Sequence, residues 1–261
     1  MTVEANAASV PFDGLDALRA ELSLAEIMHL IERTARWVSR ETFERLPVWY
    51  PEHTRRGLFY KANWSEPQHN TNRQTGVTVH KHEGNNYASK ALTHALGLRS
   101  RQRPNWSCCH IWGVDDATFG SSNVIVQDAR FYSCVANMVL LPTPLKAFTD
   151  VMPDVKWMLR ACAFNTYGWR CDHKVLGDAD LSAWTSDPAY PASWPKGPAD
   201  APPPGTVRMT AAIAHDADRR LAAIHHDLDR AGPFYPREAV VGALSYWRLP
   251  LIAAQQAVVQ R

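Results

Sequence analysis

Apolar positions recur at helical spacing near both ends of the chain. Ser23 and Glu26 have the spacing of a capping box, and the apolar positions that follow predict a helix over about residues 24–45. The same periodicity predicts helices over 85–97, from Asp150 or Pro153 to about residue 168, around 213–228, and over 236–247. Residues 1–22 are interpreted as an N-terminal arm.

Shorter apolar segments lie between these helices. Strands are expected at 57–61, 76–80 and 124–126, and two further apolar runs occupy 109–112 and 138–141. Seven prolines between Pro188 and Pro204 exclude regular structure over 186–205, which is expected to be a linker or a loop that follows the surface.

The pattern predicts an α+β fold in which helices are mixed with short antiparallel strands. We divide the chain into the arm 1–22, a central domain 23–185, the proline-rich segment 186–205 and a helical segment 206–261. With 46% hydrophobic residues, the composition is that of an ordinary globular protein. The sequence has neither an apolar run near the roughly 20 residues of a membrane span nor a signal peptide, so a cytoplasmic location without a membrane partner is expected.

Positive charge is concentrated in one part of the chain. The net charge is only +2, but residues 55–106 hold nine basic residues against two acidic ones, with aromatic and amide side chains interleaved. Basic groups neutralise phosphates, while amides and aromatic rings contact or stack on bases. A solvated polar surface would have the same composition, but the segment leads directly to His110, which favours nucleic acid. The expected contact residues are Lys61, Arg73, Lys81, Asn85, Asn86, Lys90, Arg99, Arg101 and Arg103.

Residues 105–150 carry the pattern on which the functional prediction depends. His110 lies in the first of the two apolar runs, Asn137 enters the second run 27 residues later, and Lys146 follows Asn137 by nine residues. The pattern predicts a strand ending in a polar side chain, a loop, a second strand and a helix start. Such a unit is small enough to direct a histidine, an amide and a third polar group towards one point.

This layout resembles the HNH, or ββα-metal, nuclease family. In that family a first His ends a strand, a central Asn opens an apolar stretch, and a last His follows nine residues later on a helix. His110 and Asn137 match the first two positions, and the run from Asn137 to Leu141 is similar to the family's Asn-Leu-x-x-Leu segment. The chain departs from the family at Cys109, where an acidic residue or His is usual, and at Lys146, which replaces the last His.

The resemblance implies a small ββα-metal finger at about 105–150, embedded among helices. It also implies a metal-dependent endonuclease that hydrolyses double-stranded DNA, of restriction or phage-defence type. His110 would be the general base, Asn137 would orient the histidine or a ligand, and Lys146 would bring positive charge to the phosphate. Mg²⁺ or Mn²⁺ would act as Lewis acid and template. A homodimer would suit a symmetric DNA site.

The metal ligands are the least defined part of this prediction. The candidates are Asn137, Asp128 and Cys109, with Asp115 and Asp116 as further carboxylates that the fold could bring in. Mg²⁺ prefers oxygen ligands, so Cys109 suits it poorly. A structural Zn²⁺ site that combines His110 with Cys108, Cys109 and Cys134 ranks below Mg²⁺, because adjacent cysteines are awkward co-ligands.

Other interpretations remain open at this point. A non-catalytic nucleic-acid-binding protein with a degenerate finger would account for Cys109 and Lys146, and a thiol-based enzyme would pair Cys109 with His110. His110 could also be a core histidine bonded to a backbone carbonyl, Asn137 a turn-forming amide and Lys146 a solvated helix residue. The segment from His80 to Glu83 could hold a metal, although an exposed strand end is the simpler interpretation.

Overall fold

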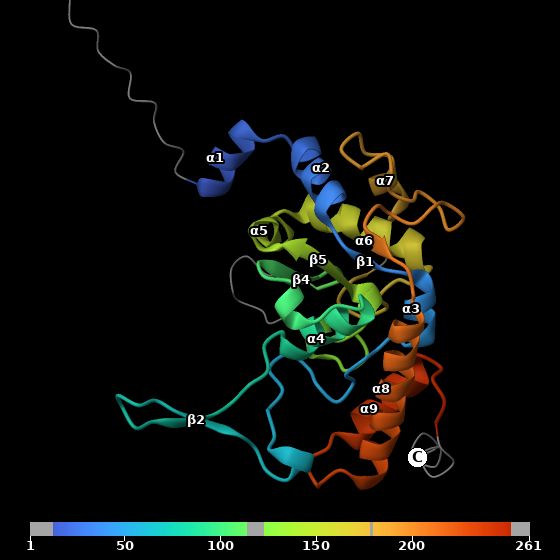
Figure 1. Cartoon of the computed structure of the whole chain (residues 1–261). Helices are drawn as coiled ribbons and strands as arrows, with labels where there is room; N and C mark the ends of the chain where they lie inside the picture. Colours follow the sequence, from blue (N-terminus) through green and yellow to red (C-terminus); the bar gives the residue numbers. More distant parts are fainter. Residues whose placement is uncertain (1–12, 114–122, 178–179, 252–261) are drawn as a thin grey trace, which may run out of the picture.

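The computed structural model describes residues 13–113, 123–177 and 180–251. Helices in these ranges surround short paired strands (Figure 1), so the expected α+β class is confirmed. Asp115 and Asp116 lie outside the described residues.

The N-terminal half contains α1 (Gly14–Glu21), α2 (Leu24–Thr34), β1 (Trp37–Val38), α3 (Arg40–Arg45), β2 (His69–Thr71), β3 (Thr78–His80), α4 (Asn86–Ala95) and β4 (Trp106–His110). The C-terminal half contains β5 (Met138–Pro142), α5 (Thr143–Val151), α6 (Pro153–Tyr167), α7 (Ser182–Thr185), β6 (Thr206–Val207), α8 (Ala211–Arg230) and α9 (Arg237–Tyr246). Short 3₁₀ turns occupy Ala62–Trp64, Ser100–Gln102, Ile125–Gln127 and Val135–Asn137.

The centre of the fold is the antiparallel pair β4–β5. Its register runs from Trp106 opposite Pro142 to His110 opposite Met138, and α5 follows β5 without an intervening loop. Arg36, just before β1, also pairs with β5, and β1 in turn pairs with β6 in parallel. This parallel pairing was not predicted, because its two strands are only two residues long.

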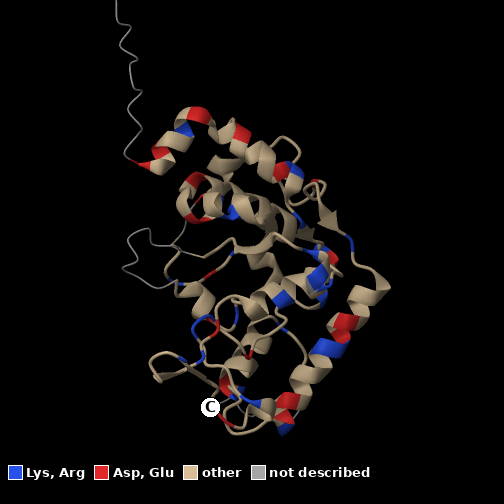
Figure 2. Cartoon of the chain, turned by 60° about the vertical axis from the view of Figure 1, so that its left-hand side comes forward, with Lys and Arg blue, Asp and Glu red and all other residues tan. Residues whose placement is uncertain are grey.

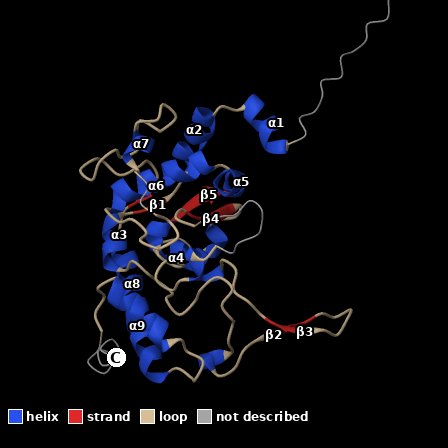
Figure 3. Cartoon of the chain, turned by 180° about the vertical axis from the view of Figure 1, so that it is seen from behind, coloured by secondary structure: helices blue, strands red, loops and turns tan. Residues whose placement is uncertain are grey.

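Large aromatic side chains fill the core around these strands. Trp37, Trp49, Trp112, Trp194 and Tyr132 each have almost no exposed surface. Charged residues of both signs are interspersed over the outer helices (Figure 2). Helix α8 packs along α3 and α4, on the side of the strands away from α1 and α2 (Figure 3).

Two predicted elements are wrong in detail. The helix expected over 24–45 is interrupted by β1, because the chain turns to pair with β6 and restarts as α3, where the Ser39 hydroxyl accepts from the Thr42 backbone N–H. Residues 124–126 form part of a 3₁₀ turn instead of a strand. The expected arm 1–22 contains α1, which the Asp13 carboxylate caps by accepting from the Leu15 N–H.

The strand expected at 76–80 is β3 of a projecting hairpin, whereas the strand expected at 57–61 is not formed. β2 and β3 pair in antiparallel fashion, and all six of their residues are exposed. The hairpin extends away from the rest of the chain (Figure 1). Residues 57–61 make only isolated bridges at its base, from Leu58 to His82 and from Tyr60 to Pro67.

The proline-rich segment packs against the core. Tyr190 and Trp194 are buried, and the Trp194 ring meets the Trp37 ring edge-on with centroids 5.8 Å apart. These two aromatic side chains fix the course of the chain between α7 and β6. No helix in the described ranges has both the length and the apolar composition that crossing a bilayer requires.

Candidate active site and nucleic-acid interface

His110 is the last residue of β4, and contacts with Tyr132 hold its imidazole ring in place. The imidazole Nε2 lies 2.9 Å from the Tyr132 carbonyl oxygen, and the two rings stack with centroids 5.9 Å apart. A carbonyl oxygen only accepts, so Nε2 must carry the proton in this hydrogen bond. In the neutral ring, Nδ1 is then the basic nitrogen. The bond to a backbone carbonyl therefore defines one tautomer of His110.

Asn137 braces the chain on both sides of the loop that follows β4. Its Oδ1 accepts from the Trp112 backbone N–H at 2.8 Å, and its Nδ2 donates to the Phe131 carbonyl at 2.9 Å. The residue has no exposed surface. This position suits the expected orienting role for Asn137, but it offers no surface on which the amide could meet a metal ion.

Arg160 on α6 is a further brace, one that sequence reasoning missed. Its guanidinium is buried and donates to the carbonyls of Ile111 and Gly113, at 3.1 Å each. It also lies over the Trp157 ring, 4.4 Å from the centroid. A charged residue within the apolar stripe of a predicted helix was the available signal, because such a residue needs buried partners.

Cys109 and Lys146 lie on the other side of β4 from the His110 contacts. Successive strand residues point to opposite faces, and Cys109 faces α5, where its thiol interacts with Thr149 and lies near Lys146. Burial raises the pKa of Cys109 to about 12, so the group is a neutral thiol near pH 7. Lys146 forms an ion pair with Asp150 one helical turn along α5.

The expected convergence of His110, Asn137 and Lys146 is thus only partly observed. The chain after His110 is joined to Asn137 through Trp112, whereas Lys146 is on the α5 face with Cys109. The two faces are separated by the β4–β5 pair itself, because residue 109 and residue 110 alternate along one strand.

The three candidate metal ligands do not meet either. Both carboxylate oxygens of Asp128 are bonded to the Arg130 guanidinium at 2.7–3.1 Å. No group of three or more His, Cys, Asp or Glu side chains that could hold a metal occurs among the described residues. Burial raises the pKa of Cys108 and of Cys134, and neither thiol belongs to a group of three or more possible metal ligands among the described residues.

The segment from His80 to Glu83 is not part of a group of three or more possible metal ligands among the residues that the structure describes. His80 lies across the hairpin from His69, with ring centroids 4.5 Å apart, and both residues are exposed. Glu83 is buried, and its Oε1 accepts from the Asn86 and Tyr87 N–H groups at the start of α4. The carboxylate therefore caps a helix, and its negative charge suits the positive end of the helix dipole.

Glu83 also connects α4 to the His110 centre. The Tyr132 hydroxyl donates to Glu83 Oε1 at 2.6 Å, while the carbonyl of the same tyrosine holds His110. One residue thus joins the helix start to the end of β4.

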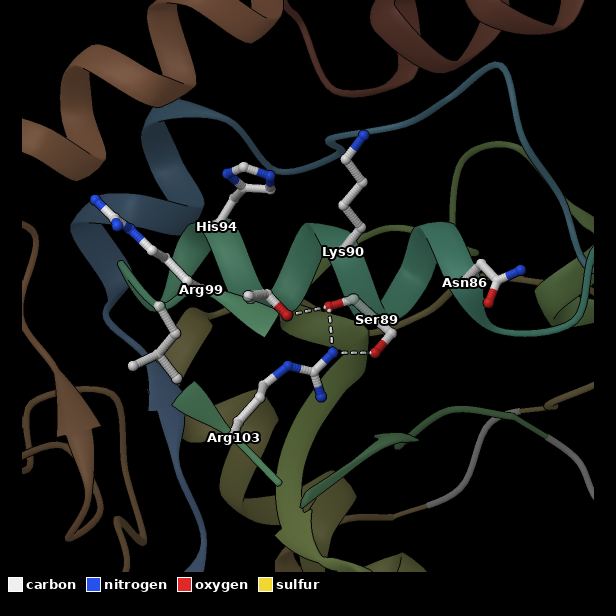
Figure 4. Close-up of a pocket in the computed structure, with 8 residues that line it drawn as sticks. Asn86, Ser89, Lys90, His94, Arg99 and Arg103 are labelled. Atoms are coloured by element: carbon white, nitrogen blue, oxygen red, sulfur yellow. Dashed lines mark hydrogen bonds between the residues drawn. The ribbon is translucent and has the colours of Figure 1, made fainter. Parts of the chain in front are cut away.

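A polar pocket lies along α4 (Figure 4). It encloses about 530 Å³ and is lined by Asn86, Ser89, Lys90, Thr93, His94, Leu98, Arg99 and Arg103. Lys90 and His94 extend from the same side of the helix, and Arg103 lies on the other side of it, bonded to Ser89. Burial lowers the pKa of His94, opposed by the nearby Asp216 carboxylate. The positive charge here comes from Lys90 and the two arginines.

The nine predicted nucleic-acid contacts occupy three places. The α4 pocket is lined by Asn86, Lys90, Arg99 and Arg103, with Asn85 preceding α4 and Arg101 exposed beside it. The hairpin carries Arg73 at its exposed turn and Lys81 near its base. The third place is Lys61, which pairs with Glu66. The Arg103 guanidinium donates to the Ser89 carbonyl and hydroxyl, so it holds its segment against α4. Lys81 lies over the Phe59 ring, 4.6 Å from the centroid. The predicted contacts are therefore spread over the hairpin and the α4 face, which is the surface formed by the residues that line the α4 pocket.

Comparison with known proteins returned nothing similar: no family model, no curated protein and no solved structure matches this chain.

Proposed function

We propose that the protein is an HNH-like, metal-dependent endonuclease that cleaves double-stranded DNA, with His110 as general base. The observation that carries the proposal is that His110 ends β4 in an antiparallel β4–β5 pair that leads directly into α5. The hydrogen bond from His110 Nε2 to the Tyr132 carbonyl, which a core histidine would also make, is compatible with a general base because it leaves Nδ1 as the basic nitrogen of the neutral ring. In the reaction His110 takes a proton from water as the water oxygen attacks phosphorus, and the bond to the leaving 3′-oxygen breaks.

The chain order around His110 supports this proposal. β4 and β5 pair in antiparallel fashion and α5 follows at once, which is the order of a ββα unit. Asn137 and Arg160 each bond to the backbone directly after His110. Their role is to fix the histidine in the orientation that the reaction requires.

Mg²⁺ or Mn²⁺ would supply Lewis-acid stabilisation of the phosphate and the leaving oxygen. The described ligand candidates fit such an ion poorly, because Arg130 engages the Asp128 carboxylate and Cys109 offers a buried sulfur where Mg²⁺ prefers oxygen. The metal requirement is therefore tested directly by adding each cation and by chelation.

DNA contact is assigned to the hairpin and the α4 face. A two-stranded ribbon fits the major groove, and the exposed β2–β3 ribbon carries Asn70 and Asn72 on the same face as Val77 and Val79. Amides can pair with adenine edges, and valine can contact the thymine methyl group. Lys90 and Arg99 would meet phosphates. A DNA substrate agrees with the cytoplasmic location and with the homodimer on symmetric sites that the sequence suggested.

A second candidate is a DNA-binding protein that does not cleave. This second candidate is favoured by the position of Lys146 on the other side of β4 from His110. The residue that takes the place of the family's last His then contributes no charge next to His110.

The test uses supercoiled plasmids that differ in sequence and methylation. Purified protein is incubated with Mg²⁺, with Mn²⁺ or with chelator, and the affinity for duplex is measured over a salt series in parallel. Cation-dependent nicking supports the endonuclease. Tight, salt-sensitive binding without nicking on any plasmid supports the second candidate, and failure to bind or cut rejects both.

A further inference from the structure

A second pocket lies at the base of the hairpin, next to the α4 face. It encloses about 330 Å³, at the lower end of the range for small-molecule sites. Its walls are unusually rich in planar side chains: His53, Phe59, Tyr60, Trp64 and Tyr87 all line it. Neither the nuclease chemistry nor the hairpin contact uses this pocket.

The planar side chains of the walls contact one another in sequence. The ring centroids of Tyr60 and Trp64 are 5.1 Å apart, those of Trp64 and His53 are 5.1 Å apart, and His53 stacks on Tyr87. Burial, followed by the charges of Arg220 and Lys90, lowers the pKa of His53 to about 3, so its ring is neutral. His53 is enclosed between Trp64 and Tyr87, whereas Tyr60 and Trp64 are half-buried and keep aromatic surface of the kind on which planar ligands stack.

The backbone is strained at Trp64, one of the residues that form the pocket wall. Asn63 and Trp64 have φ values of 54° and 56°, in the left-handed region that bulky residues rarely adopt. Gly232 keeps them there: its N–H donates to the Asn63 carbonyl, and a Cβ at residue 232 would lie 2.5 Å from that oxygen. Strained residues that the surroundings hold in place tend to occur at binding sites.

The pocket also has a buried carboxyl group. Glu52 is 8% exposed, and its Oε1 pairs with Arg220, but its Oε2 has no hydrogen-bond partner among the described residues. Buried polar atoms are nearly always bonded, so an unmatched acceptor at a pocket points to a ligand with a donor group. Glutamate accepts well from the exocyclic amino group of a base.

Lys90 connects this pocket with the α4 face, since it lines both. Its Nζ is 5.1 Å from the Tyr50 ring centroid and 5.6 Å from that of Tyr87. A cation at the mouth of an aromatic pocket suits a ligand in which a planar ring is joined to a phosphate.

We propose that this pocket receives one unstacked nucleobase with an exocyclic amino group, from the DNA strand whose phosphates lie along α4. The inference rests on the proposed DNA-binding function and adds to it the recognition of an extruded base. Unstacking costs least where a base is unpaired. The protein should therefore prefer duplexes that contain an unpaired cytosine over fully matched ones.

The test places a large side chain at an exposed residue that lines the pocket, so that the pocket is filled. Ala62 is exposed and lines the pocket, so Ala62→Trp fills it without disturbing the core. Ala183→Trp, at an exposed position on α7, is the matched control, and Tyr60→Ala removes a wall if Ala62→Trp misfolds. Affinities for a matched duplex and for the same duplex with one unpaired cytosine are measured, and calorimetry follows free dCMP and dTMP.

The wild type and Ala183→Trp should bind the duplex with the unpaired cytosine roughly tenfold more tightly than the matched duplex, because no base pair has to be broken before this base is extruded. Ala62→Trp should lose this preference and keep its affinity for matched duplex. Retention of the preference in Ala62→Trp, or equal binding of dCMP and dTMP, would overturn the proposal.

The free nucleotides separate this proposal from the DNA-binding function. Duplex binding with no preference and no dCMP binding would overturn the pocket inference alone. Binding of dCMP that Ala62→Trp abolishes, without any duplex binding, would keep the nucleobase site and assign it to a free nucleotide. Absence of both would overturn both proposals.

Discussion

The carbonyl oxygen of Tyr132 lies 2.9 Å from Nε2 of His110, so the backbone of Tyr132 makes the hydrogen bond that orients the imidazole. The ring of Tyr132 stacks with that of His110, and its hydroxyl donates to Glu83 at the start of α4. The two roles of Tyr132 can therefore be separated by substitution.

Tyr132→Phe should destabilise the fold and leave DNA cleavage intact. The change removes the hydroxyl bond to buried Glu83, which should lower the free energy of unfolding by about 1–2 kcal/mol. The carbonyl that orients His110 is unaffected. Urea denaturation and plasmid nicking measure the two effects, and a folded variant without nicking would show that the hydroxyl acts in the reaction.

Asn137→Ala should lower the free energy of unfolding by more than the removal of a small side chain would on its own. It leaves the Trp112 N–H unpaired in a region without solvent, at about 1–3 kcal/mol, and leaves the Phe131 carbonyl with only the Cys134 backbone N–H as a donor. Chemical denaturation gives the loss, with Asn70→Ala on the exposed hairpin as the control at under about 0.5 kcal/mol. Similar losses in the two variants would contradict the bracing role of Asn137.

Acid should weaken the fold through His53. The folded-state pKa of about 3 lies below the ordinary value of 6.5, so the unfolded chain takes up a proton that the folded chain does not. The stability from neutral His53 is complete above pH 6.5 and is lost as pH falls from 6.5 towards 3, by up to about 1.4 kcal/mol per pH unit.

His53→Gln should flatten this dependence in urea titrations between pH 7.5 and pH 5, whereas His29→Gln, at a largely exposed position, should not. An unchanged slope in His53→Gln would mean that other groups dominate the acid response.

The salt dependence of DNA binding should depend on Lys90 and Arg99. Each phosphate contact that is lost should reduce the slope of log affinity against log salt by about 1. Lys90→Ala and Arg99→Ala remove charges from the α4 pocket, and Lys196→Ala removes one from the proline-rich segment as a control. Equal slopes in all three variants would place the phosphates on another face.

The sequence predicted the elements with strong local signals. The capping box at Ser23, the periodic apolar face of α4 and the proline-initiated start of α6 all lie where the pattern placed them. The two-residue strands β1 and β6 were not predictable, because their pairing depends on contacts between residues far apart in the chain.

Only the part of the candidate site that depends on local sequence was predicted. The position of His110 at a strand end followed from the short apolar run in which it lies. Local sequence could not reveal that Cys109 would face α5, that Arg160 would reach back to Gly113, or that Glu52 and Trp64 would share a pocket. These contacts depend on how α6, α8 and the hairpin base pack together.

The role of His110 is tested by comparing plasmid nicking by wild type and His110→Ala at protein concentrations that saturate DNA binding for both. We expect His110→Ala to bind DNA as the wild type does and to lose at least about 10²-fold in cleavage rate, the contribution of a general base. Equal cleavage by the two proteins would contradict this expectation and place the chemistry away from His110.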